Sequence, residues 1–149
     1  MHPELTELPT GPVAPNTRLV RVIGRRVVIA GRIPLDAEGY LTGPHGRVGH
    51  TVFLEQAKTS SEAIICAILA NLRHEVGDLA QVGAWIKLDG WVDAAPGFVD
   101  LAAIMNPASE LIFDICGTEV GAHARYVIGF TGPRFGAPVE LAAEVKLLR

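Results

Sequence analysis

Residues 19–30 read LVRVIGRRVVIA, two runs rich in β-branched residues on either side of Gly24, Arg25 and Arg26. β-Branched residues favour extended chain, and a glycine between two such runs favours a tight turn. The stretch therefore predicts a strand, a turn and a second strand. Residues 31–49 follow with GRIPLDAEGYLTGPHGRVG, which is rich in glycine and proline. We expect a long loop there, and long loops in small domains are often functional.

The segment after this loop, residues 54–76, changes to a helical period. Its small and apolar positions recur at spacings of three and four, which predicts an amphipathic helix with one broad apolar face. These positions are Ala57, Ser61, Ile64, Ile65, Ile68, Leu69 and Leu72. Gly77 follows directly and is expected to end the helix.

Residues 82–92 read VGAWIKLDGWV and predict a third strand. Strict alternation assigns its side chains to two faces, Ala84, Ile86 and Leu88 on one and Trp85 and Lys87 on the other. A turn is expected next, in AAPGF at residues 94–98.

A second helix is predicted within residues 98–116, where apolar positions again recur at helical spacing. Pro107 interrupts this pattern. Proline fits the first position of a helix, and an asparagine before it is a good N-cap. A fresh helical segment can therefore start at Pro107, with Asn106 as its cap.

Two strands are predicted at the end of the chain, at residues 124–130 and 138–148. The first is apolar on both faces, whereas the second alternates cleanly between apolar and charged positions. The element order is then ββαβαββ, an α+β class in which two helices pack on one face of a mixed sheet. The other face also needs a cover, which points to self-association.

The composition excludes several classes of function. Hydrophobic residues make up 49% of the 149 residues and charged residues 19%, which excludes intrinsic disorder. A net charge of −3 argues against a grip on nucleic-acid phosphates, which needs clustered excess Lys and Arg. The mean hydropathy is +0.31, yet no apolar run reaches the roughly 20 residues of a membrane-spanning helix. We therefore expect no membrane segment, and apolar surface buried inside the fold or against a partner subunit.

The chain is expected to form one domain over residues 1–149, with residues 1–16 as an extended, proline-rich lead-in. The start has no apolar core segment of a secretory signal, so a cytoplasmic location is expected. In such a reducing compartment Cys66 and Cys116 are expected to be buried thiols rather than a disulfide. Generic nucleotide, hydrolase and metal motifs are absent and the five histidines lack ligand spacing. No metal and no cofactor are expected.

The chain resembles the Rid (reactive intermediate deaminase) or YjgF family, also labelled L-PSP endoribonucleases. The segment VVIAGRIPLDAEGYLTG, residues 27–43, is similar to the family signature of a hydrophobic run followed by S/A–G–Q–I–P. APGF at residues 95–98, then HAR and GAPVE, resemble a bacterial branch of the family in the same order. The resemblance covers roughly residues 24–148. It implies a chorismate-mutase-like α+β domain that forms a homotrimer with clefts between subunits.

The resemblance also implies a site. Active members hydrolyse imines or enamines of 2-amino acids to 2-keto acids and ammonia. Arg125, in HAR, matches the arginine that holds the substrate carboxylate, as a forked and permanently charged guanidinium can. Glu140, in PVE, matches the glutamate that orients the attacking water, and Asn106 matches an asparagine that approaches the cleft. Gly31 would offer its backbone N–H to the carboxylate.

Each of these residues has a simpler structural interpretation. Arg125 can belong to a surface or interface salt bridge, and Glu140 stands on the polar face of an amphipathic strand, where a solvated carboxylate is ordinary. Asn106 can be only a helix cap. Gly31 can simply allow a bend between strand and loop.

The chain also departs from the active members of the family. Thr17 stands where they carry a tyrosine that closes over the ligand, and Ala30 stands where they carry a hydroxyl residue. Arg32 replaces a glutamine, and Ala142 replaces a second glutamate.

Two functions therefore compete. The first is hydrolysis of a reactive imine or enamine of a small carboxylate-bearing metabolite. The second is a non-catalytic trimeric module that binds such a carboxylate or stabilises proteins. Ribonuclease activity is disfavoured because the sequence is acidic and shows no pair of catalytic histidines.

Overall fold

The first two strands form the hairpin that residues 19–30 predict. The computed structural model describes residues 16–132 and 134–149, so the start of the predicted lead-in lies outside the described residues. Strand β1 (Val20–Ile23) pairs antiparallel with β2 (Arg26–Arg32). Ile23 pairs with Arg26, which leaves a two-residue turn in which Gly24 has a positive φ of 59°. Arg26 thus belongs to the second strand and not to the turn.

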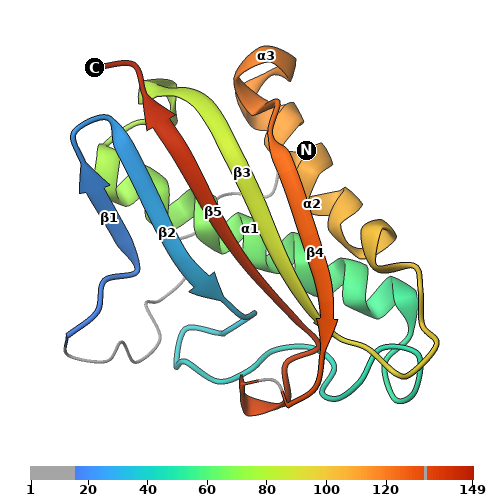
Figure 1. Cartoon of the computed structure of the whole chain (residues 1–149). Helices are drawn as coiled ribbons and strands as arrows, with labels where there is room; N and C mark the ends of the chain where they lie inside the picture. Colours follow the sequence, from blue (N-terminus) through green and yellow to red (C-terminus); the bar gives the residue numbers. More distant parts are fainter. Residues whose placement is uncertain (1–15, 133) are drawn as a thin grey trace.

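The hairpin is one end of a mixed sheet. In the described part of the chain the strand order is β1-β2-β5-β3-β4 (Figure 1). The last strand, β5 (Val139–Leu147), lies between β2 and β3 (Val82–Asp93) and is antiparallel to both. Strand β4 (Ala124–Phe130) is parallel to β3 and forms the other edge. The predicted strands are confirmed, with β5 shorter by one residue at each end, β3 longer by Asp93 and β2 extended to Arg32.

Helices pack on one face of this sheet, which confirms the predicted α+β class. Figure 1 shows α1 (Leu54–Val76) and α2 (Leu101–Cys116) on the same side of the strands. The bounds of α1 are as predicted, and it ends where the N–H of Gly77 donates to the carbonyl of Arg73 at 2.8 Å. The short helix α3 (Thr118–Gly121) was not expected from the sequence. None of the helices in the described ranges is both long and apolar enough to cross a membrane.

Helix α2 runs through Pro107 without a break, so the predicted fresh start at this residue is wrong. The helix begins at Leu101, with Asp100 as its N-cap residue. Proline removes one helical hydrogen bond. The apolar face nevertheless continues on both sides of Pro107, and burial of Met105 before it and Ala108 after it holds both halves against the same core.

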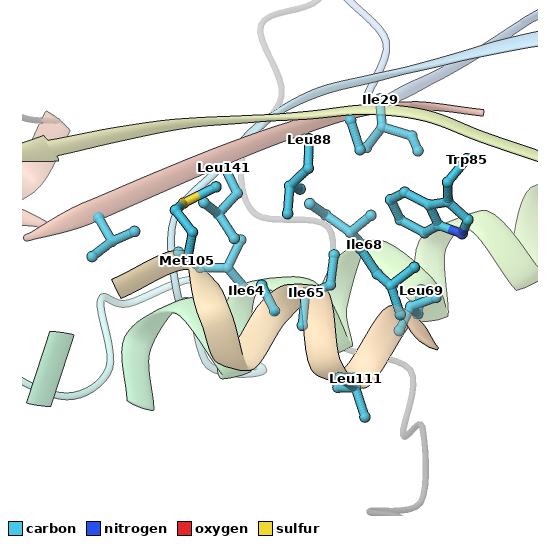
Figure 2. Close-up of a cluster of buried hydrophobic side chains, with 14 of the residues drawn as sticks. Ile29, Ile64, Ile65, Ile68, Leu69, Trp85, Leu88, Met105, Leu111 and Leu141 are labelled. Carbon is cyan, nitrogen blue, oxygen red and sulfur yellow. The ribbon is translucent and has the colours of Figure 1, made fainter. Parts of the chain in front are cut away.

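The core lies between the sheet and the two long helices. Figure 2 shows isoleucine and leucine side chains of α1 meeting Leu88 of β3, Leu141 of β5 and Met105 of α2. Along β5, buried residues alternate with polar ones as predicted. The buried apolar members of this strand are Val139, Leu141, Ala143 and Val145, and Glu144 is buried as well at 6% exposure. Each of these apolar side chains points to the helix side of the sheet. Glu140 and Glu144, at alternate positions, therefore point to the opposite face, which no described helix covers and which we call the open face.

The predicted faces of β3 are wrong in its first half. Trp85 is 2% exposed and pairs with the core residue Val145, whereas Ile86 is 39% exposed. The register with β5 shifts between Trp85 and Lys87, so Ile86 is an extra residue in a β-bulge. Alternation resumes with Leu88 pointing into the core. Trp85 and Leu88 therefore share a face that strict alternation assigned to Ile86 and Leu88.

Glu144 forms an ion pair with Arg26 on the open face. Its carboxylate accepts hydrogen bonds from Nε of Arg26 and, at 3.0 Å, from Nη2 of the same residue. These bonds, together with the charges of Arg26 and Lys87, lower the pKa of the Glu144 carboxyl, and desolvation opposes them.

This pair predicts a stability that depends on pH. Because the folded pKa of Glu144 is lowered, its contribution is complete above the ordinary glutamate pKa of about 4.3 and is lost as the pH falls through the folded value. We expect Glu144→Gln to lower the free energy of unfolding at pH 7, and the difference from the wild type to shrink on acidification. Urea denaturation at several pH values measures this. A difference that stays constant to pH 3 would contradict the assigned pair.

Candidate functional site

Arg125 lies near the start of β4, the edge strand beside α2. It pairs with Leu88, a core residue of β3, so its side chain is on the helix side of the sheet. Its Nη1 donates to Oδ1 of Asn106 at 3.0 Å and to Oγ of Ser109 at 3.3 Å. The structure therefore brings together two of the residues that the sequence singled out.

Asn106 is not a helix cap. It lies inside α2, on an exposed position, and its side-chain carbonyl accepts from the guanidinium of Arg125. This contact replaces the capping interpretation. Asn106 therefore helps to orient Arg125.

Arg125 makes no ion pair with any carboxylate in the described ranges. By contrast, the guanidinium of Arg26 meets Glu144, and that of Arg47 meets Asp93 at 2.9 Å. The partners of Arg125 are two neutral oxygens, and the residue is exposed. Arg125 is therefore not part of a salt bridge among the described residues. Its positive charge is available to an external anion.

Ser109 and His123 extend this contact inward, and neither was predicted from the sequence as a site residue. Oγ of Ser109 lies 3.0 Å from Nε2 of His123, and Nδ1 of His123 lies 2.6 Å from the carbonyl oxygen of Gly121. Ser109 follows Asn106 by three residues on the helix, and His123 precedes Arg125 by two. Helical spacing places Ser109 on the same face as Asn106, and strand spacing places His123 on the same side as Arg125. These spacings are the signal in the sequence that points to Ser109 and His123.

Glu140 and Gly31 form a second pair, on β5 and β2. A Cβ added to Gly31 would lie 2.2 Å from Oε1 of Glu140, so the carboxylate occupies the space that a side chain would need. The register between β2 and β5 shifts between Ile29 and Arg32, which turns Gly31 toward the open face. The close approach of the Glu140 carboxylate therefore requires a glycine at position 31, whether or not the chain also bends there.

The two pairs lie on opposite faces of the sheet. In β3, Arg125 is level with Leu88 and Glu140 is level with Trp91, and the two residues lie on either side of this strand. Strand geometry then separates their Cα atoms by about 14 Å. One copy of the chain does not place its own Arg125 against its own Glu140.

A pocket of about 470 Å³ opens beside Gly31. The neighbouring Arg32 lines it, although this residue is only 5% exposed. The remaining wall is mostly apolar and consists of Leu19, Ile33, Leu35, Gly39, Tyr40, Leu41, His45 and Phe135. Such a pocket suits an apolar group of a ligand with a few polar contacts at its rim.

The two cysteines lack the features of reactive thiols, and the described residues form no metal-binding cluster. Cys66 and Cys116 are free thiols, half-buried, and burial raises the pKa of each. A raised pKa keeps a thiol protonated and a poor nucleophile. Within residues 16–132 and 134–149, no three His, Cys, Asp or Glu side chains gather in a way that could hold a metal ion.

Comparison with known proteins finds relatives that are more than 30% identical to the chain. The chain is 31% identical over 137 residues to Protein TCP17 of Trypanosoma cruzi, a match that covers 90% of this chain and 84% of that protein. It is 33% identical to Atu1372 of Agrobacterium tumefaciens, a protein of unknown function. That crystal structure matches with a TM-score of 0.83 over 93% of this chain and 86% of the other. No protein-family model matches the chain.

More distant structures show which fold this is. An endoribonuclease-like protein of Shewanella oneidensis matches with a TM-score of 0.80 at 19% identity, over 95% of this chain and 92% of that one. L-PSP and RidA proteins are among the further structural neighbours. The architecture is thus the L-PSP/chorismate-mutase-like α+β fold that the resemblance implied.

Proposed function

Since the chain belongs to the family of Protein TCP17 of Trypanosoma cruzi and has the L-PSP/RidA/YjgF fold, we propose that it binds a small carboxylate through Arg125 and hydrolyses 2-imino or 2-enamino acids. The observation that carries this proposal is the exposed guanidinium of Arg125, which two neutral oxygens orient and no carboxylate among the described residues neutralises. A guanidinium in this state is a ready partner for a ligand carboxylate.

The site is completed by a second copy of the chain in this proposal. Arg125 and Glu140 lie on opposite faces of one sheet, so their meeting requires residues of two subunits. The open face offers a surface for this contact because no described helix covers it, and it exposes Val28 and Tyr126 by 38% and 55%. We take the assembly to be a homotrimer with a cleft at each interface.

The chemistry needs one anchor and one base. The guanidinium of Arg125 holds the substrate carboxylate while a water molecule attacks the imine carbon. Glu140 accepts a proton from this water and passes it on to the imine nitrogen, which gives a carbinolamine and restores the carboxylate. The carbinolamine then expels ammonia and leaves the 2-keto acid. Gly31 leaves room for the Glu140 carboxylate.

Ammonia release from freshly generated 2-iminopropionate and 2-iminobutyrate tests this proposal. We expect release above the uncatalysed rate, and a loss of about 10- to 100-fold in kcat/KM in Arg125→Ala, because charge-assisted hydrogen bonds to the carboxylate disappear. Activity that survives unchanged in Arg125→Ala would contradict the anchor. No release by a folded oligomer that still binds 2-oxobutanoate through Arg125 would favour the non-catalytic module.

Gly31→Ala probes the position of the carboxylate. The new Cβ would meet Oε1 of Glu140 at 2.2 Å, so Glu140 must swing away, and we expect kcat/KM to fall at least about tenfold. Stability should change little because the displaced group is the end of a flexible, partly exposed side chain. Gly129→Ala is the matched control, since its Cβ would meet its nearest neighbours at 3.6 Å. Equal effects of the two variants would count against the role of Gly31.

A further inference from the structure

The hydrogen bonds behind Arg125 run in one direction. The carbonyl of Gly121 can only accept, so Nδ1 of His123 carries a hydrogen and donates it. In the neutral ring Nε2 is then an acceptor, and the hydroxyl of Ser109 donates to it over 3.0 Å. The lone pairs of that hydroxyl remain free to accept from Nη1 of Arg125 at 3.3 Å. Every donor in this chain meets an acceptor.

The inner end of this chain is held by packing. Ser109 is 8% exposed, and the ring of His123 stacks on Phe113 at a centroid distance of 5.7 Å. The ring of Trp85 lies against the same imidazole with a centroid distance of 6.3 Å and an interplanar angle of 56°. The imidazole is therefore held by contacts with two aromatic side chains. It can hold the Ser109 hydroxyl in one orientation.

The outer end determines which edge of Arg125 stays free. Nη1 carries two hydrogens, and Asn106 and Ser109 take one each. Nε and Nη2 make no hydrogen bond to any other residue that the structure describes. A carboxylate can therefore bind only to the side edge formed by Nε and Nη2, and not to the end formed by the two Nη atoms.

We propose that Ser109 and His123 are positioning residues that lock the guanidinium of Arg125 so that it receives a carboxylate side-on. This proposal rests on the proposed function for the identity of the anion. The lock itself belongs to the free protein and can be tested without any ligand.

Nitrogen NMR of the free protein tests the lock. We expect His123 to show the tautomer with a protonated Nδ1 and an acceptor Nε2, and we expect the two Nη atoms of Arg125 to give separate signals because rotation about Cζ is hindered. In Ser109→Ala these signals should merge. The opposite tautomer, or merged signals in the wild type, would overturn the proposal whether or not any ligand binds.

Binding of 2-oxobutanoate tests the consequence. Ser109→Ala should weaken binding by about tenfold and raise KM with little change in kcat, because one hydrogen bond that orients the anchor is lost. In an Arg125→Ala background the same substitution should have no further effect, since the residue acts through Arg125. Ser61→Ala, another buried serine on a helix, is the control and should leave binding unchanged.

The two proposals fail in different ways. If 2-oxobutanoate binds neither the wild type nor any variant while the NMR signature holds, the proposed function fails and the lock stands. If binding depends on Arg125 but Ser109→Ala weakens it equally in both backgrounds, the proposed function stands and the positioning role is wrong. A loss of stability alone would change the free energy of unfolding without this dependence on the background.

Discussion

Glu140→Gln is expected to lower kcat for ammonia release from 2-iminobutyrate by about 10²- to 10⁴-fold, the usual contribution of a positioned general base. Glutamine has nearly the shape of glutamate, so it fits the space that Gly31 leaves free. It lacks the ability to take a proton from water. Steady-state kinetics measures the loss.

The binding of the product should separate catalysis from recognition. We expect 2-oxobutanoate to bind Glu140→Gln as tightly as the wild type or somewhat more tightly, because one negative charge near the ligand is removed. Parallel loss of binding and turnover would mean that Glu140 shapes the cleft and is not the base.

Glu144 provides the matched control on the same face of the same strand. It is held by Arg26, so Glu144→Gln should lower stability at neutral pH and leave kcat of the folded protein unchanged. If both glutamine variants lose turnover to the same degree, the effect comes from the charge of the open face and not from a base at Glu140.

Local signals in the sequence predicted most of the elements. The period of α1 and Gly77 after it determine both ends of that helix, because spacing and a left-handed residue act within one turn. The bounds of β4 are also as predicted. Helix α2 was harder to predict, because Pro107 is an unfavourable local signal and burial of residues on both sides outweighs it.

The candidate site depended more on resemblance than on pattern. Spacing alone does not bring Asn106 and Arg125 together, since they are 19 residues apart and meet only when α2 packs beside β4. Gly31 and Glu140 are separated by most of the chain and meet because β5 inserts beside β2. Spacing places Ser109 beside Asn106 and His123 beside Arg125, but the contact between the two pairs forms only when α2 packs beside β4.

Which side chains of β3 face the core depends on a non-local feature, the bulge in its pairing with β5. Trp85→Ala tests this assignment, and its expected effect on stability is large. We expect this substitution to lower the free energy of unfolding by about 3–5 kcal/mol, the usual cost of removing a buried tryptophan side chain. The side chain packs in the core beside Ile68 and Leu69 (Figure 2). An alanine at this position would leave a cavity there. Urea denaturation at a fixed protein concentration measures the loss.

Ile86→Ala, at the next position, is the control that separates a bulge from simple alternation. Strict alternation puts Ile86 in the core with Leu88 and exposes Trp85, which predicts that the Ile86 variant is the more damaging one. The bulge between Trp85 and Lys87 reverses this order, and we expect a loss of only about 1 kcal/mol for the partly exposed isoleucine. A larger loss in Ile86→Ala than in Trp85→Ala would mean that β3 pairs with β5 without the bulge. Trp85 and Ile86 would then exchange faces, and the aromatic contact of Trp85 with His123 behind the Arg125 anchor would not form.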